Sequence, residues 1–125
     1  MTQPHVLMTN DDGGDAPGLR ALFTALSEVA QVTVVAPVSQ RSGNSHMITL
    51  ETPLRAWPLS QYPGYMVEYT PVDCVKLALT QLLPEPPALV VSGINAGWNA
   101  GNLVHYSGTV GAAKEAALNG IPAIA

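Results

Sequence analysis

Charged residues are scarce in this sequence. They make up 11% of its 125 residues, whereas apolar residues make up 47%. The net charge is -4 and the five basic residues are scattered, so no basic stripe could neutralise a nucleic-acid backbone, which excludes a nucleic-acid polymer as the expected partner. Many apolar residues with little charge are typical of a parallel sheet buried on both faces. The basic residues are Arg20, Arg41, Arg55, Lys76 and Lys114.

Cysteines and long apolar runs are lacking too. Cys74 is the only cysteine, which excludes an internal disulfide and a cysteine-rich zinc site and favours a reducing compartment. No apolar run approaches the ~20 residues of a membrane span, and the first residues lack the pattern of a signal peptide. We therefore expect a cytoplasmic protein that does not contact a membrane. Its length suits one domain, residues 1–125, and is too short for two.

Strand and helix patterns alternate in the first half of the chain. Residues 6–9 form a short apolar strand pattern, and the polar run 10–15 that follows is rich in turn-forming residues. A helix is expected from Pro17, with apolar residues at helical spacing as far as Ala30. The β-branched stretch 32–36 predicts a second buried strand, so this half is a strand, helix, strand unit.

The alternation continues in the second half. Thr70 followed by Pro71 and Asp73 has the form of a helix N-terminus, with a hydroxyl cap, a proline and a carboxylate. Strands that alternate with helices predict an α/β fold, Rossmann-like and doubly wound, with a mainly parallel sheet in three α/β/α layers. The sequence stops inside its last expected strand, so it looks truncated at the C-terminus. We expect further strands at 47–54, 65–69, 89–91 and 121–125, and helices at 74–83 and 109–118.

Two adjacent acids follow the first strand. In open α/β sheets, ligands bind beyond the carboxyl ends of the strands, which is where Asp11 and Asp12 are expected. Adjacent carboxylates repel each other, and a divalent cation allows both to stay ionised. The alternative is that Asn10 to Gly13 is simply an Asx-type turn that caps the next helix.

The loop from Ser92 to Gly108 has a composition that suits an anion. Its glycines allow the backbone to approach a ligand closely, Asn95 and Asn99 present amides, and Ser107 to Thr109 stands at a helix N-terminus. A phosphate would fit such a loop. The alternative is that the glycines only permit tight turns.

Other candidate motifs are weaker or absent. The loop around Ser42 offers hydroxyls but no second acid, and by itself it indicates only a loop. His5, His46 and His105 lack metal-ligand spacing and are expected on the surface or in loops, while Cys74 is expected in the core. The dinucleotide fingerprint, the phosphate-binding P-loop and the serine-hydrolase elbow are all missing from the sequence.

Seven short motifs, taken together and in order, resemble the SurE family, the stationary-phase survival proteins. The resemblance runs from the first strand to the last residue, and it is specific because the motifs stand in the family's order. They are Thr9–Gly13 (TNDDG), Ala16–Gly18 (APG), Val34–Pro37 (VVAP), Arg41–Gly43 (RSG), Thr70–Cys74 (TPVDC), Val91–Asn95 (VSGIN) and Tyr106–Val110 (YSGTV).

The resemblance implies a divalent-metal-dependent phosphatase that hydrolyses nucleoside 5′- and 3′-monophosphates and, in some members, short polyphosphate. It implies one cation per site, Mg²⁺, Mn²⁺ or Ca²⁺, which all-oxygen ligands select, and a homodimer or homotetramer. Asp11 and Asp12 would be the catalytic residues, with Asp11 orienting or deprotonating a metal-activated water. The implied metal ligands are Asp11, Asp12, Ser42 and Asn95, and the phosphate would contact Asn99, Ser107, Gly108 and Thr109.

The chain also departs from the family pattern. Tyr69 stands where the family usually has glycine, Trp98 where proline is common, and Asn102 where aspartate is frequent. Family members also continue well past Ala125. Two alternatives to the enzyme therefore stay open: a non-catalytic fragment that binds metal and nucleotide, and an oligomerisation module.

Overall fold

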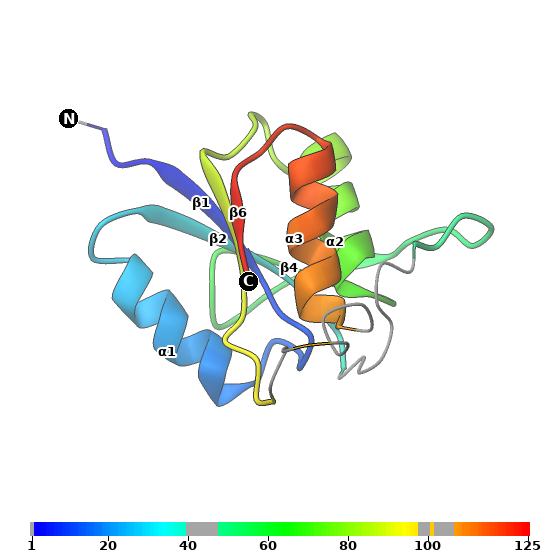
Figure 1. The fold of residues 1–125 in the computed structure, drawn as a ribbon, viewed down its shortest axis with the longest axis horizontal. Helices are drawn as coiled ribbons and strands as arrows, with labels where there is room; N and C mark the ends of the chain where they lie inside the picture. The colour runs from blue at the N-terminus through cyan, green and yellow to red at the C-terminus, as the bar shows by residue number, and fades with distance from the viewer. Residues whose placement is uncertain (1, 40–47, 98–100, 102–106) are drawn as a thin grey trace.

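One six-stranded sheet forms the centre of the computed structural model, which describes residues 2–39, 48–97, 101 and 107–125 (Figure 1). Strands and helices alternate for most of this length, as the sequence predicts. The strands are β1 (His5–Thr9), β2 (Gln31–Pro37), β3 (Ala56–Pro58), β4 (Gly64–Val67), β5 (Leu89–Ser92) and β6 (Ala123–Ile124). The helices are α1 (Pro17–Leu26), α2 (Pro71–Leu77) with its π-helical extension η1 (Ala78–Leu82), and α3 (Gly108–Leu118).

The strand order is β3-β4-β2-β1-β5-β6. All neighbouring pairs are parallel except β3 and β4, which are antiparallel. The chain first builds outward from β1 to β2 and β4, and it then returns to the other side of β1 to add β5 and β6. This reversal makes the sheet doubly wound and mainly parallel, as predicted, and it sets a topological switch point between β1 and β5.

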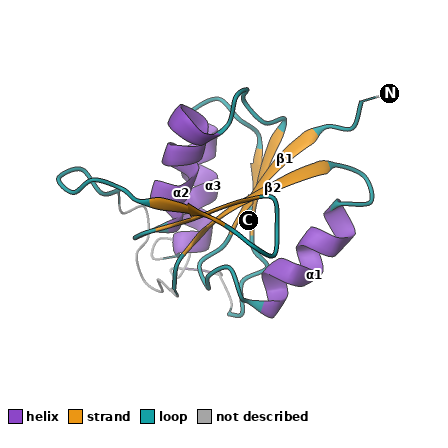
Figure 2. Ribbon diagram, turned by 180° about the vertical axis from the view of Figure 1, so that it is seen from behind, coloured by secondary structure: helices purple, strands orange, loops and turns teal. Residues whose placement is uncertain are grey.

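Helices cover both faces of the sheet, which confirms the three-layer arrangement. Helix α1 lies on one face, and α2 and α3 lie side by side on the other (Figures 1 and 2). Along β1 the side chains alternate between these layers, because successive residues of a strand point to opposite faces. Met8 packs in the cluster under α1 with Leu19, whereas Leu7 packs in the cluster under α2 and α3 with Cys74. Cys74 is fully buried, as expected, and burial raises the pKa of its thiol.

Helix α2 begins as the sequence predicts. The Thr70 hydroxyl accepts a hydrogen bond from the Asp73 N–H, and the Asp73 carboxylate accepts one from the Thr70 N–H, both at 3.1 Å. This reciprocal pair is a capping box, with Pro71 at the first helical position. Among the described residues, no helix is long and apolar enough to span a membrane.

The expected strand at 47–54 is wrong over its described residues, 48–54. The edge strand of this region is instead β3, a few residues later. Residues near Thr49 are held by the start of α2: the Thr49 N–H and hydroxyl both donate to the Asp73 carboxylate, each at 2.7 Å. The Thr49 N–H is therefore used by a side chain 24 residues away and not by a neighbouring strand.

Tyr69 explains why the next strand ends early. Its φ is +80°, a left-handed conformation that only glycine adopts without cost, so the strand expected at 65–69 ends at Val67. The same conformation gives a physical reason for the glycine that the resembling family usually has here. The cost of placing tyrosine in this conformation is roughly 1 kcal/mol.

Among the glycines in the described ranges, Gly64 leaves the least room for a side chain. Its φ is +141°, and a Cβ here would overlap the carbonyl oxygen of Val34 on β2. We expect Gly64→Ala to lower the free energy of unfolding by about 2–3 kcal/mol in urea denaturation. Gly120→Ala is the matched control, because Gly120 also has a positive φ (+79°) but open space around it, and it should lose only about 1 kcal/mol. Equal losses in the two variants would contradict the close approach of β4 to β2.

Candidate metal and phosphate site

The two loops at the switch point start side by side. Thr9, the last residue of β1, is paired with Ser92, the last residue of β5. The loop after β1 carries Asp11 and Asp12, and the loop after β5 carries Asn95. Residues that the sequence separates by more than 80 positions are thus brought to one edge of the sheet.

Asn10 shapes the first loop. It is fully buried, its amide nitrogen donates to the Gly13 carbonyl at 2.8 Å, and its amide oxygen accepts from the Gly13 N–H at 3.1 Å. An Asx-type turn is therefore present, as the alternative interpretation held. It does not cap α1, however, because the N-cap of α1 is Ala16 and has no side-chain hydrogen bond. The turn leaves both aspartates available for a ligand.

Asp11 is a buried carboxylate beside the start of α3. Only 6% of the residue is exposed, and a Cβ on Gly108 would lie 2.8 Å from its Oδ1. That oxygen has no hydrogen-bond partner among the described residues. Burial, with a smaller contribution from the charge of Asp12, raises the pKa of Asp11 to about 6. A buried carboxylate oxygen without a partner is costly, and a bound cation would offset that cost.

Asp12 and Asn95 lie on the two loops that start at the switch point. The Ala96 N–H donates to the Asp12 carboxylate in a long hydrogen bond of 3.4 Å, which ties the second loop to the first. The Asn95 side chain bends back on its own loop, where its amide nitrogen donates to the Gly97 carbonyl at 2.7 Å. Asp12 and Asn95 line the same pocket, of about 630 Å³, together with Pro17 and Ile94.

The start of α3 carries further buried polar groups. Ser107 is the N-cap, and its hydroxyl accepts from the Val110 N–H at 3.2 Å. The hydroxyls of Thr109 and Ser92 are buried without a hydrogen-bond partner in the described part of the chain. Both residues line a second pocket of about 350 Å³ next to Asn95. The unpaired Thr109 hydroxyl at a helix N-terminus suits an anionic ligand, which the helix dipole also favours. The Ser92 hydroxyl lines the same pocket from the end of β5.

The donor chemistry fits a hard cation. No three His, Cys, Asp or Glu residues converge anywhere in the described ranges, so the two aspartates would need hydroxyl or amide oxygens to complete a ligand set. Asn95 supplies such an amide beside Asp12. The predicted ligand Ser42 and the predicted phosphate contact Asn99 lie outside the described residues, as do His46 and His105.

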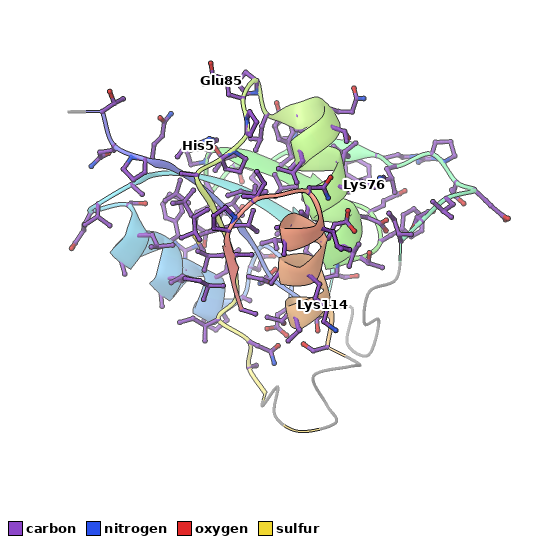
Figure 3. All side chains as sticks on the ribbon, turned by 45° about the horizontal axis from the view of Figure 1, so that its top comes forward. His5, Lys76, Glu85 and Lys114 are labelled. Carbon is purple, nitrogen blue, oxygen red and sulfur yellow. The ribbon has the colours of Figure 1, made fainter. Side chains whose placement is uncertain are left out.

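His5 does not belong to this site. It is the first residue of β1, at the opposite end of the strand, where Figure 3 shows it on the same side of the molecule as Glu85. It is partly exposed, in agreement with the expected surface position, and it lies in a strand and not in a loop. Its Nε2 is 2.8 Å from the Thr33 hydroxyl on β2, a contact that belongs to the sheet.

Comparison with known proteins decides the family. The profile described as "Survival protein SurE" matches residues 6–125, almost the whole chain. The chain belongs to the SurE family. Over 97% of this chain, it is 58% identical to a protein named "5'-nucleotidase SurE" from Alkalilimnicola ehrlichii. Over 100% of this chain, it is 48% identical to the protein of that name from Chlorobium phaeobacteroides.

A solved SurE structure shares the fold. The SurE protein from Aquifex aeolicus matches 98% of this chain with a TM-score of 0.91 and 44% sequence identity. The chain spans about half the length of the relatives it matches: 47% and 50% of the two named nucleotidases and 50% of the solved chain.

Two positioning residues of this SurE-family chain were not singled out as functional from its sequence. One is Asn10, which makes the turn that carries the aspartates. The other is Gly18 on α1, where a Cβ would lie 2.5 Å from the carbonyl oxygen of Ile94, next to Asn95. The Asn10 turn is local and was expected as a turn, without a role at the site, whereas the close approach of Gly18 to Ile94 joins residues far apart in sequence. Each of the two residues stands within a motif of the resemblance.

The raised pKa of Asp11 predicts how stability depends on pH. Because the pKa is about 6 in the folded chain and 3.8 ordinarily, the folded state binds more protons between these values, and stability falls as pH rises through this range. Without metal, we expect Asp11→Asn to gain about 2 kcal/mol of stability relative to the parent chain when pH is raised from 4.5 to 7.5. Urea denaturation in EDTA at both pH values measures this, and a gain that does not change with pH would contradict it.

Proposed function

We propose that the chain carries the active site of a divalent-metal-dependent phosphatase that acts on nucleoside 5′- and 3′-monophosphates. The proposal depends chiefly on one observation: the Asp11 oxygen beside the start of α3 is buried and has no hydrogen-bond partner among the described residues. The nucleotidase names of its relatives support the same reaction class.

One set of the chain's residues would bind the cation, and another set would bind the phosphate. Asp11, Asp12 and Asn95, with Ser42 from the preceding loop, would hold the cation, which when bound supplies Lewis acidity and lowers the pKa of a water. Asp11 would orient or deprotonate that water.

The start of α3 would bind the phosphate. The first N–H groups of a helix have no intrahelical partner. The Ser107 hydroxyl accepts a hydrogen bond from one of them, the Val110 N–H. The N–H groups of Gly108 and Thr109, together with the Thr109 hydroxyl, would then donate to the phosphate oxygens. Asn99 would complete the set. These donors would stabilise the charge that develops on the phosphate oxygens in the transition state.

The test is phosphate release from AMP and GMP with Mn²⁺, and again with EDTA. We expect turnover that depends on Mn²⁺ and is lost in chelator. Undiminished turnover in EDTA would exclude the metal mechanism. Calorimetric binding of Mn²⁺ and AMP without any turnover would instead identify the alternative function, a fragment that binds metal and nucleotide. This alternative is considered because the chain covers about half the length of its relatives. The expected homodimer or homotetramer is tested separately by light scattering.

A further inference from the structure

The turn between β3 and β4 is held firmly against α1. Tyr62 in this turn is buried, with its ring centre 4.7 Å from that of Phe23, and the Arg20 guanidinium lies 5.7 Å from the Tyr62 ring centre. The turn therefore folds back over the face of the sheet that α1 covers (Figure 1). Its position is fixed by aromatic packing, so it can form a wall of a binding pocket.

A pocket of about 220 Å³ lies between this turn and the loop after β1. A cavity of about 150 Å³ is large enough to take a benzene ring, so this one has room for a fused two-ring heterocycle. Its lining combines apolar and polar surface, and its polar side chains come from two loops. The walls are Gly14, Pro37, Val38, Pro58, Leu59 and Met66, and the polar residues are Asp15, Ser60 and Gln61.

Asp15 and Gln61 form a hydrogen-bonded pair at this pocket. The Gln61 amide nitrogen donates to the Asp15 carboxylate at 2.6 Å, across 46 residues of sequence. The carboxylate keeps further acceptor sites, and the carboxamide keeps one N–H donor and its carbonyl oxygen. Acceptors next to a donor complement the edge of a purine, where an exocyclic amino group stands beside ring nitrogens.

The pocket adjoins the candidate metal and phosphate site. Asp15 also lines the 630 Å³ pocket that is lined by Asp12 and Asn95, so this residue borders both cavities. Only three peptide units separate Asp12 from Asp15, and their Cα atoms can be no more than roughly 11 Å apart. A ribose would bridge that interval, with a phosphate at one end and a base at the other.

We propose that this pocket binds the purine base of the substrate, with Asp15 and Gln61 as residues that determine specificity. The inference rests on the proposed function, because it takes a nucleoside monophosphate as the ligand. It predicts that the chain prefers AMP and GMP to ribose 5-phosphate, which has the same sugar and phosphate but no base.

The experiment compares kcat/KM for AMP, GMP and ribose 5-phosphate in three variants. Ser60→Trp fills the pocket from its exposed rim, and Gln61→Ala removes the amide. We expect both to lower the values for AMP and GMP about tenfold and to leave ribose 5-phosphate within about twofold. Gln81→Ala, an exposed glutamine on η1, is the matched control and should change none of the three.

Equal losses on all three substrates, or no loss on AMP and GMP, would overturn the base pocket and leave the phosphatase intact. Absence of phosphate release from every substrate would overturn the proposed function instead. In that case an NMR titration with adenosine still tests the pocket. Shifts of the Gly14 and Gln61 amide signals would support it, and shifts confined to Gly18, Ile94 and their neighbours would contradict it.

Discussion

Replacing Asp11 with asparagine is expected to lower kcat/KM for phosphate release from AMP by roughly a thousandfold or more. The variant loses a charged metal ligand and the candidate general base in one step, and each of these contributes a hundredfold or more in comparable sites. Asparagine has nearly the same size, so the buried position beside Gly108 stays filled. The measurement is phosphate release with saturating Mn²⁺ at pH 7.5.

A parallel stability measurement separates this loss from unfolding. At the same pH the metal-free Asp11→Asn chain should be no less stable than the parent, because burial disfavours the Asp11 charge. Glu28→Gln, which removes an exposed carboxylate just after α1, is the control and should keep full activity. If Asp11→Asn retained activity within tenfold of the parent, Asp11 would not be at the reacting centre.

The second large effect is expected from Gly108→Ala. The added Cβ would lie 2.8 Å from the Asp11 carboxylate oxygen and 3.3 Å from the Cγ of Pro71, so Asp11 or the start of α3 must shift. Displacements of about 1 Å at reacting groups cost on the order of a hundredfold in rate. We therefore expect about a hundredfold lower kcat/KM for AMP, together with weaker Mn²⁺ binding.

Helix propensity works in the opposite direction for this variant. Alanine favours a helix over glycine by roughly 1 kcal/mol, so any loss of activity would not come from a weaker α3. Gly120→Ala, at the other end of α3 with open space around it, should lose stability but keep activity. Parent-like activity in Gly108→Ala would contradict a role for the contact between Asp11 and α3 in the proposed reaction.

The parts of the fold that depend on local sequence were predicted well. The capping box at Thr70 and Asp73 follows from residues three positions apart, and it is present with both of its hydrogen bonds. The strands β1 and β2 were predicted because continuous β-branched and apolar runs are typical of strands buried on both faces. The doubly wound, mainly parallel sheet then follows from the alternation of strands and helices.

The parts that depend on contacts distant in sequence were not predicted. The strand expected at 47–54 is replaced by a segment held by Asp73, and the early end of β4 reflects the left-handed φ of Tyr69. A propensity pattern does not show that a side chain 24 residues away will bind a segment, and it does not give the backbone angle of a single residue. The short antiparallel edge strand β3 was missed for the same reason, since only pairing with β4 makes it a strand.

The candidate site shows the same division. The sequence placed Asp11 and Asp12 after a strand, and the structure adds that the carboxylate of Asp11 is buried and unpaired next to α3. Asn95 and Thr109 were named from their loop, and the switch point brings that loop to the aspartates. Asn10 was expected only as part of a local turn, and Gly18 received no role, because its close approach to Ile94 joins residues far apart in sequence.

Calorimetric titration of Mn²⁺ into the metal-free chain tests the central claim most directly, because it needs no turnover. We predict one cation per chain in a saturable site, and affinity at least roughly tenfold weaker in both Asp11→Asn and Asp12→Asn, since each variant removes one charged oxygen ligand. Glu28→Gln should bind like the parent. Unchanged affinity in both aspartate variants would contradict a metal site at the end of β1.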